Sequence, residues 1–230
     1  MEPIVVATGN PHKVEELRAI FAAEGLAVVG LRDLPGHEAF REPEEHGRTF
    51  EENAAIKARS YAAQTGRLCL ADDSGLEVDA LGGAPGVISS HFATDGRDTG
   101  VPREERDRAN NARLLRDLEG VEPERRSARF VCVMCLADPA GRILATARGT
   151  FEGRIGLPGD VPRGSNGFGY DPLFVLPPPD QRTSAELTPE EKNARSHRGA
   201  AARAMAREIR RLGLGGGPSD RQGSPSGPAR

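Results

Sequence analysis

The first part of the chain combines a strand, a tight turn and a helix, and this arrangement constrains the fold more than any other feature. The apolar run Ile4-Val5-Val6-Ala7 is typical of a buried strand, and it stops at Thr8-Gly9-Asn10-Pro11. Asn10 can cap a helix and Pro11 suits its first position. The helix would end at Gly25 and carry one apolar stripe of Val14, Leu17, Ile20 and Phe21. A buried strand leading directly into an amphipathic helix favours the α/β class.

The rest of the chain alternates between helical and strand patterns. Helices are predicted from Thr49 to Gly66, from about Glu104 to Leu118, briefly after Thr188, and from about Ser196 to Leu212. Strands are predicted at Leu68–Ala71, ending at Asp72, and at 127–137 and 142–152, which a turn at Asp138–Gly141 joins. The order β-α-α-β-α-β-β-α-α predicts an α/β fold with a partly antiparallel sheet.

Composition narrows the class of protein. The 230 residues carry a net charge of −3 and 37% apolar residues, without tryptophan. This balance argues against nucleic-acid binding through a broad basic surface, and no apolar run approaches the roughly 20 residues that cross a bilayer. Three cysteines are too few for a disulfide framework, and no secretory signal is visible, so we expect a cytoplasmic protein. We expect one domain over residues 1–212 and a disordered Gly/Pro/Ser-rich tail over residues 213–230.

The turn between the first strand and helix is a candidate anion site. Backbone N–H groups at a helix start bind anions, and Gly9 allows a ligand to approach closely. Lys13 in the first helical turn opposes the helix dipole, a penalty that a bound phosphate would reverse. A solvated lysine beside an ordinary capping turn explains the same residues equally well.

A second candidate site is Asp72-Asp73-Ser74-Gly75 at the predicted carboxyl end of a strand, where α/β proteins bind ligands. Adjacent carboxylates repel each other unless a cation offsets them, and hard oxygen ligands suit Mg²⁺. The alternative is a turn in which Asp and Ser satisfy local backbone groups. A metal or catalytic role is favoured.

Three further segments carry weaker signals. Glu45 lies in an acidic loop before the second helix, and Lys57 lies within that helix, where lysines are usually exposed. The glycine-rich stretch 164–172 can close over a flat ring, or it can be a surface loop. Lys192, His197 and Arg198 offer donors to an anion or a base carbonyl near the start of the last helix.

Two other motifs are set aside. Cys132 and Cys135 have C-x-x-C spacing, but their odd offset on a strand points the thiols to opposite faces. No second pair completes a zinc site, so packing explains these cysteines better. The stretch from Gly164 to Gly169 has the wrong spacing for a dinucleotide fingerprint, and no strand leads into it.

Five blocks in this order resemble the noncanonical purine nucleoside triphosphate pyrophosphatases, also called dITP/XTP or inosine triphosphate pyrophosphatases. The blocks are Ala7-Thr8-Gly9-Asn10 with Lys13 and Glu16; Glu45 to Ala54 with Lys57-Ala58; Asp72 to Leu76 through Pro85-Gly86; Gly167 to Pro172; and Ala185-Glu186-Leu187 through Lys192 to Ser196-His197-Arg198. They span about residues 4 to 200, and together they are far more specific than any one of them.

The resemblance implies an elongated mixed central sheet, with flanking helices that form two lobes around a cleft, and a homodimer. It implies Mg²⁺-dependent hydrolysis of ITP, dITP and XTP to the monophosphate and pyrophosphate. By position, Asp73 would be the general base and a metal ligand, Glu45 the second metal ligand, and Lys57 a nearby catalytic cation. The resemblance assigns substrate binding to Thr8, Gly9, Asn10, Lys13, Ser74, Phe168, Gly169, Tyr170, Asp171, Lys192, His197 and Arg198.

One position departs from the family pattern. Where the family has an arginine after Ser-Ala, this chain reads Ser90-His91-Phe92, which makes some pH dependence near neutrality conceivable.

Two other functions explain these residues less well. A nucleotide-binding regulatory module without turnover would not need a base beside a metal, and RNA binding through Arg125, Arg126 and Arg129 lacks the aromatic residues for stacking.

Overall fold

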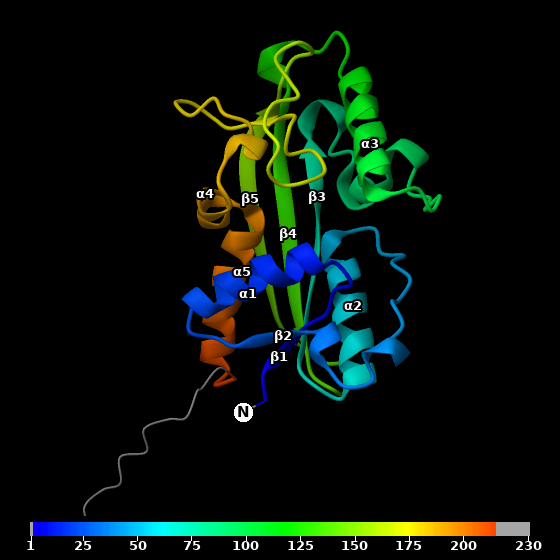
Figure 1. Cartoon of the computed structure of the whole chain (residues 1–230), viewed down its shortest axis with the longest axis vertical. Coiled ribbons are helices and arrows are strands. Elements are labelled where there is room, and N and C mark those ends of the chain that lie inside the picture. The colour runs from blue at the N-terminus through cyan, green and yellow to red at the C-terminus, as the bar shows by residue number, and fades with distance from the viewer. Residues whose placement is uncertain (1, 215–230) are drawn as a thin grey trace, which may run out of the picture.

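The computed structural model describes residues 2–214 and shows a mixed α/β fold around one six-stranded sheet (Figure 1). Its strands are β1 (Ile4–Val6), β2 (Val28–Gly30), β3 (Cys69–Val78), β4 (Ser127–Ala137), β5 (Ile143–Ile155) and β6 (Phe174–Val175). Its α-helices are α1 (Pro11–Ala23), α2 (Phe50–Thr65), α3 (Arg103–Asp117), α4 (Pro189–Arg195) and α5 (His197–Arg211). Short 3₁₀ helices occupy Leu31–Asp33, His37–Ala39, Asp79–Leu81, Gly86–Thr94, Pro123–Arg125 and Ser184–Glu186.

The sheet has the order β2-β1-β3-β4-β5-β6. β1 runs parallel to β2 and β3, whereas β4, β5 and β6 each pair antiparallel with the strand before them. The predicted α/β fold with a partly antiparallel, elongated sheet is confirmed. The sequence patterns missed β2 and β6, which are too short to show a period.

The predicted helix boundaries hold because their capping residues act as expected. Asn10 Oδ1 accepts a hydrogen bond from His12 N at 3.1 Å, and Thr49 Oγ1 accepts one from Glu52 N at 3.2 Å. Gly66 follows α2 in a left-handed conformation (φ 65°), which a side chain would disfavour. The predicted tail begins at Gly213, and its residues 215–230 lie outside the described part of the chain.

Helices cover both faces of the sheet. On one face, alternate strand residues such as Val6, Leu70 and Met134 pack against α1 and α5. On the other face, the intervening residues such as Val5 and Val133 pack against α2. A third apolar cluster lies toward the other end of the sheet, where α3 contributes Leu114 (Figure 1). The sheet therefore connects two helical lobes.

The prediction that a strand ends at Asp72 is wrong. β3 continues to Val78, because every residue from Cys69 to Val78 has a partner on β4. β1 pairs with β3 only as far as Leu70. The acidic pair therefore lies in the middle of a long strand, just beyond the carboxyl end of β1.

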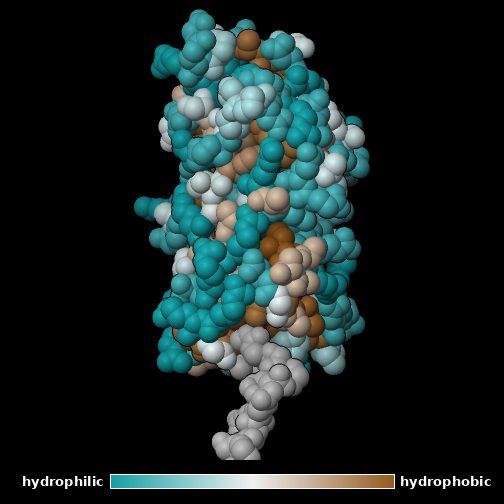
Figure 2. Space-filling model, turned by 90° about the vertical axis from the view of Figure 1, so that its left-hand side faces the viewer, coloured by the Kyte–Doolittle hydropathy of each residue, from teal (hydrophilic) through white to brown (hydrophobic). Residues whose placement is uncertain are grey.

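One face of the molecule is mostly hydrophilic (Figure 2). Figure 2 shows apolar residues in small separate groups on the face that it presents. Among residues 2–214, Leu212 is the one large apolar side chain classed as exposed, at 36%. No helix within the same range is long and apolar enough to cross a membrane.

Candidate functional site

The site is built around the segment of β3 that β1 leaves uncovered. Asp72 and Asp73 follow each other on β3, so their side chains point to opposite faces of the sheet. The sequence alone predicts that the two adjacent carboxylates repel each other unless a cation or a proton offsets them. The pleat of the strand separates them instead, and each carboxylate has its own lysine partner.

On the face covered by α1 and α5, Asp72 holds two cations. Its Oδ2 lies 3.0 Å from Lys13 Nζ and 3.4 Å from Arg198 Nε, and its side chain is 1% exposed. Burial alone would raise the pKa of Asp72, but Lys13 and Arg198 outweigh it and hold that pKa well below its usual range. Lys13 thus has a carboxylate partner that offsets its unfavourable place in the first turn of α1.

On the other face, Lys57 joins two carboxylates. Its Nζ lies 3.1 Å from Asp73 Oδ1 and 2.8 Å from Glu45 Oε2, while Asn53 Nδ2 donates to Asp73 Oδ2 at 3.3 Å. Burial alone would lower the pKa of Lys57, but Asp73 and Glu45 more than offset this and raise it. Lys57 was expected to be exposed if judged by its helix alone, yet it is 7% exposed.

Asp73 has the properties of a proton acceptor. Its burial and the neighbouring Glu45 charge raise its pKa against the opposing effect of Lys57. A carboxylate with a raised pKa binds a proton more readily, which suits a general base.

Glu45 and Asp73 are also the residues that could hold a divalent cation. Both present carboxylate oxygens to one point, now filled by the Lys57 ammonium, and the Glu45 side chain is 34% exposed. Hard oxygen donors fit Mg²⁺, which commonly takes one or two carboxylates together with substrate phosphates and water. Within residues 2–214 no group of three or more His, Cys, Asp or Glu side chains converges as a complete metal site.

The predicted anion turn adjoins these lysines. Thr8 Oγ1 accepts from Asn10 N at 3.2 Å, which fixes the turn between β1 and α1. A Cβ built at Gly9 would lie 4.0 Å from Glu42 Oε2, so an acidic side chain of the loop before α2 stands over the turn. Sequence reasoning did not single out Glu42, because acidic loop residues are usually only solvated.

Arg198 is the main hydrogen-bond donor on the face of the sheet that α1 and α5 cover. It is 2% exposed, and its guanidinium contacts Glu16 Oε2 at 2.8 Å and Ser74 Oγ at 3.0 Å in addition to Asp72. Ser74 lies two residues after Asp72 and therefore on the same face of β3. The structure thus brings Lys13, Ser74 and Arg198 together around Asp72.

Three buried polar atoms around Arg198 have no hydrogen-bond partner within residues 2–214: Glu16 Oε1, Asp72 Oδ1 and His197 Nδ1. The His197 ring stacks on Phe130, with ring centres 5.1 Å apart. Burial, reinforced by Arg198 and Lys192, lowers the pKa of His197 well below its usual value, so the ring is neutral at pH 7. Unpaired buried polar atoms are costly and mark a place where a polar ligand can bind.

The glycine-rich loop is organised by Asp171. Its carboxylate accepts from Phe168 N at 2.8 Å, from Ser184 Oγ at 2.8 Å and from Lys192 Nζ at 2.6 Å. Tyr170 is buried beneath the loop, and its hydroxyl donates to Ser89 O at 2.7 Å. Within this arrangement Asp171 and Tyr170 hold the loop in shape, while direct substrate contact by either residue stays a prediction.

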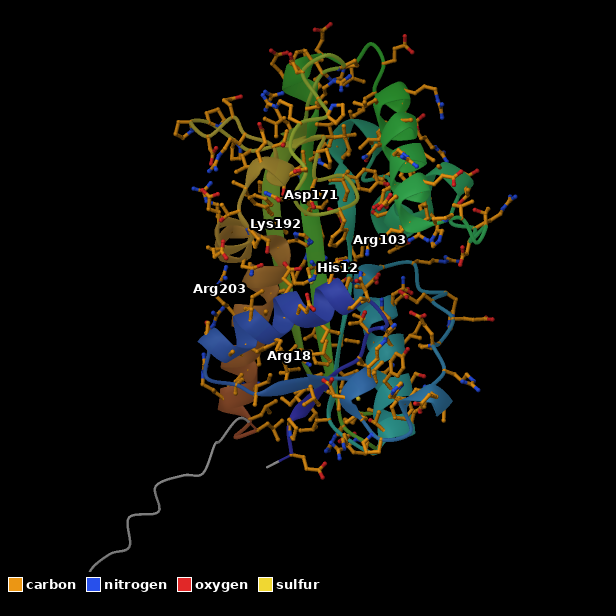
Figure 3. The ribbon with its side chains drawn as sticks, in the orientation of Figure 1. His12, Arg18, Arg103, Asp171, Lys192 and Arg203 are labelled. Atoms are coloured by element: carbon orange, nitrogen blue, oxygen red, sulfur yellow. The ribbon has the colours of Figure 1, made fainter. Side chains whose placement is uncertain are left out.

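A cleft of about 890 Å³ opens beside this loop. Its walls come from α1, from the first turns of α3, from the glycine-rich loop and from α4. Figure 3 shows His12, Arg103, Asp171 and Lys192 gathered around it from these elements. Phe168 and Gly169 line the cleft together with Lys192. A cleft of this size can hold a drug-sized ligand.

The structure also shows the surroundings of His91, where the chain departs from the family pattern, and of the Cys132–Cys135 pair. His91 Nδ1 is 2.9 Å from Ser90 Oγ, and its Nε2 is 3.2 Å from Arg106 of α3, so it packs against the α3 lobe. Cys132 and Cys135 pack into apolar clusters on opposite faces of the sheet, as their spacing predicted.

Comparison with known proteins gives one consistent result. The Ham1 family profile matches residues 4–208. A dITP/XTP pyrophosphatase of Nitratidesulfovibrio vulgaris is 52% identical over 202 residues, which cover 88% of this chain and 93% of the relative. One of Frankia alni is 51% identical over 209 residues, covering 91% and 98%.

Solved structures of related proteins also resemble this chain. A HAM1 protein from Coxiella burnetii superposes with a TM-score of 0.77 at 38% identity, covering 92% of this chain and 100% of that one. A nucleoside-triphosphatase, described as a dITP/XTP pyrophosphatase, from Mycobacterium abscessus gives a TM-score of 0.66 at 44% identity, covering 89% and 98%.

Proposed function

The chain belongs to the Ham1 family, and from this membership we propose that it is a nucleoside triphosphate pyrophosphatase acting on noncanonical purine nucleotides. The substrates would be ITP, dITP and XTP, cut to the monophosphate and pyrophosphate. Relatives named dITP/XTP pyrophosphatase at about half identity, over nearly their whole length, support this choice of substrate.

One observation carries the chemical part of the proposal: two lysines with largely buried side chains flank the uncovered edge of β3, one on each face. Lys13 and Lys57 are each held by carboxylates, so their positive charges are fixed before any ligand binds. A triphosphate carries about four negative charges, and catalysis of its cleavage depends on neutralising and aligning them. Thr8, Gly9 and Asn10 would add hydrogen bonds to the phosphates next to Lys13.

Asp73 would act on the attacking water. As a carboxylate, it can take a proton from a water that attacks the α-phosphorus. Lys57 keeps the carboxylate in place through a contact of 3.1 Å, and Asn53 fixes its second oxygen.

Glu45 and Asp73 would hold the Mg²⁺ ion. When bound, Mg²⁺ would neutralise phosphate charge and lower the pKa of a coordinated water. Each carboxylate uses one oxygen for Lys57, Glu45 Oε2 and Asp73 Oδ1, and its other oxygen is a hard donor of the kind that fits this ion.

The purine would be read by donors at the start of α5. Hypoxanthine and xanthine present a carbonyl at position 6, whereas adenine presents an amino group there. A buried donor such as Arg198, or a backbone N–H, pairs with a carbonyl and is left unsatisfied by an amino group. Such a mismatch costs about 1–3 kcal/mol, equivalent to roughly 5- to 150-fold in selectivity. Phe168 and Gly169 would contact the base from the glycine-rich loop, and Lys192 from α4.

The first test is pyrophosphate release from ITP, dITP, XTP, ATP and GTP, with Mg²⁺ and with EDTA. We expect release from ITP, dITP and XTP but not from ATP, and only with Mg²⁺. GTP also presents a 6-carbonyl, so its turnover measures whether other contacts select against its 2-amino group. Asp73→Asn should lower kcat by about 10²- to 10⁴-fold, because the amide cannot accept the proton. The single amide oxygen can accept from Lys57, which also keeps Glu45, but the amide nitrogen then faces the Asn53 donor, so the melting temperature should fall modestly while the protein stays folded.

Two results would contradict the proposal. Equal turnover of ATP and ITP would remove the claim of base selectivity. Tight binding of ITP without pyrophosphate release would indicate a nucleotide-binding module instead of an enzyme.

A further inference from the structure

Arg103, the first residue of α3, covers the aromatic ring of the cleft. Its guanidinium carbon lies 4.2 Å from the centre of the Phe168 ring. Asp107, one turn further along α3, lies 3.7 Å from Arg103 Nε. Figure 3 shows Arg103 reaching the cleft from the side of α3, and Lys192 reaching it from the side of α4.

The backbones on both sides of this contact are tied together. Asp107 Oδ2 accepts from Gly169 N at 3.0 Å, and Asn111 Nδ2 donates to Gly169 O at 3.0 Å. Gly169 directly follows Phe168, so α3 and the glycine-rich loop keep a fixed spacing. With the two backbones held, the gap above the ring depends on the side chains, and the Arg103 side chain is long and 36% exposed.

Lys192 cannot play the same part. Its Nζ lies 5.4 Å from the centre of the Phe168 ring, but it is bound to Asp171 at 2.6 Å and is only 13% exposed. A buried ion pair of this kind holds its position. Arg103 is the movable cation of the two.

The present contact leaves no room for a base between Arg103 and the ring. Two flat layers in van der Waals contact with an inserted purine need about 7 Å, since each contact takes about 3.5 Å. A guanidinium is planar, and it stacks on the face of a base as well as on an aromatic ring.

We propose that Arg103 is a substrate-binding residue that lies on Phe168 in the free protein, moves aside as a purine base enters, and then covers the outer face of that base. This inference rests on the proposed function, because it takes a purine nucleotide as the ligand. Phe168 and Arg103 then form the two walls of one slot for the base. Edge donors such as Arg198 select the kind of purine, whereas this slot holds any purine.

The test compares Arg103→Ala and Arg103→Lys with a matched control, Arg116→Ala. Arg116 lies on the same helix, is exposed and does not line the cleft, so its removal changes the charge of α3 equally. Binding is measured with α,β-methylene ITP, which cannot be cut between the α- and β-phosphates. Inorganic tripolyphosphate, which has no base, serves as a second probe.

Arg103→Ala should weaken binding of α,β-methylene ITP by about 5- to 20-fold, the range expected from losing one stacking partner. Its affinity for tripolyphosphate should stay within about twofold of the parent value. Arg103→Lys should restore only part of the loss, because an ammonium is not planar. In turnover of ITP, KM should rise with kcat nearly unchanged.

Three results would overturn the inference. One is tighter or unchanged binding of the analogue by Arg103→Ala, since Arg103 would then only obstruct the ring. Another is an equal loss for tripolyphosphate, which would indicate a general charge effect. The last is the same loss in Arg116→Ala. Because the analogue is not cut, the binding result stands even if the wild-type protein releases no pyrophosphate from ITP, which would refute the proposed function alone.

Discussion

At the scale of single residues, the site is defined by which carboxylate holds which cation. Asp72 binds Lys13 and Arg198, while Asp73 and Glu45 share Lys57. None of these pairings follows from sequence spacing, since Arg198 lies 126 positions after Asp72. Buried pairs of this kind stabilise little in net terms, but removing one partner leaves an uncompensated charge. These ion pairs therefore hold the charged side chains of the site in place, and they also make the site sensitive to substitution.

Replacing Asp72 with alanine should be strongly destabilising. The change leaves the 2%-exposed Arg198 and the mostly buried Lys13 without their shared carboxylate. We expect a loss of about 3–5 kcal/mol in the free energy of unfolding, measured by urea denaturation at pH 7. Glu208→Ala, which breaks the exposed pair with Arg211, should cost less than about 1 kcal/mol. Equal losses in the two variants would refute the idea that burial decides the effect.

The same carboxylate predicts a dependence of stability on pH. Because the folded-state pKa of Asp72 is depressed, its contribution is fully present above the unfolded value of about 4 and is lost as pH falls from there toward the folded pKa. The difference in unfolding free energy between wild type and Asp72→Ala should therefore shrink below about pH 4. Urea titrations at pH 7, 4 and 3 measure it, and a constant difference would contradict the depressed pKa.

At the scale of elements, close backbone contacts position the ends of helices. Gly149 of β5 lies directly under the start of α5, where a Cβ would overlap the backbone of His197 and Ala201. α5 carries His197 and Arg198 at its first turn, so this one glycine sets how near they come to the sheet. The pattern for a final helix was visible in the sequence, but its distance from β5 was not.

Gly149→Ala should therefore affect both stability and substrate binding. Forcing a methyl group into this contact costs about 1–3 kcal/mol and shifts α5 outward. We expect a melting temperature several degrees lower and a raised KM for ITP, because the Arg198 donor moves. Thr150→Ala, at the next and exposed position of β5, is the control and should leave KM unchanged. A lowered melting temperature with an unaltered KM would show that α5 does not position the site.

At the scale of the whole molecule, the sheet carries two lobes (Figure 1). Residues of α1 and α3 both line the cleft. α1 packs on one face of the sheet beside α5, while α3 belongs to the apolar cluster at the other end. The homodimer that the family resemblance implies stays a prediction, which sedimentation velocity can test.

The predicted tail gives a test at the same scale. Residues 215–230 contain almost no apolar side chains, so their sequence offers no surface to bury against the domain. A chain ending at Leu214 should keep its melting temperature within about 2 °C, measured by calorimetry, and its rate of ITP cleavage. A clear loss of either would assign the tail a structural or catalytic role.

Much of the architecture was readable in the sequence because it depends on local chemistry. Asn10, Pro11 and Thr49 set the starts of two helices, and Gly66 ends one, through the conformations that these residues favour. Periods of apolar residues identified the long strands and helices, whereas β2 and β6 were too short for a period. The site motifs were recognisable together, because five blocks in the order of one family are far more specific than any single block.

The tertiary structure decided what those residue types do to one another. Sequence adjacency suggested that Asp72 and Asp73 act as a pair, but an extended β3, stabilised along its whole length by β4, turns them to opposite faces. The burial of Lys57 and Arg198 could not be predicted from their neighbours in the sequence either, because it depends on segments that are distant in the chain. The Arg103–Phe168 contact arises only where α3 meets the glycine-rich loop. Local conformational preferences determine the helices and strands, and long-range packing determines which charged side chains pair and which residues contact one another.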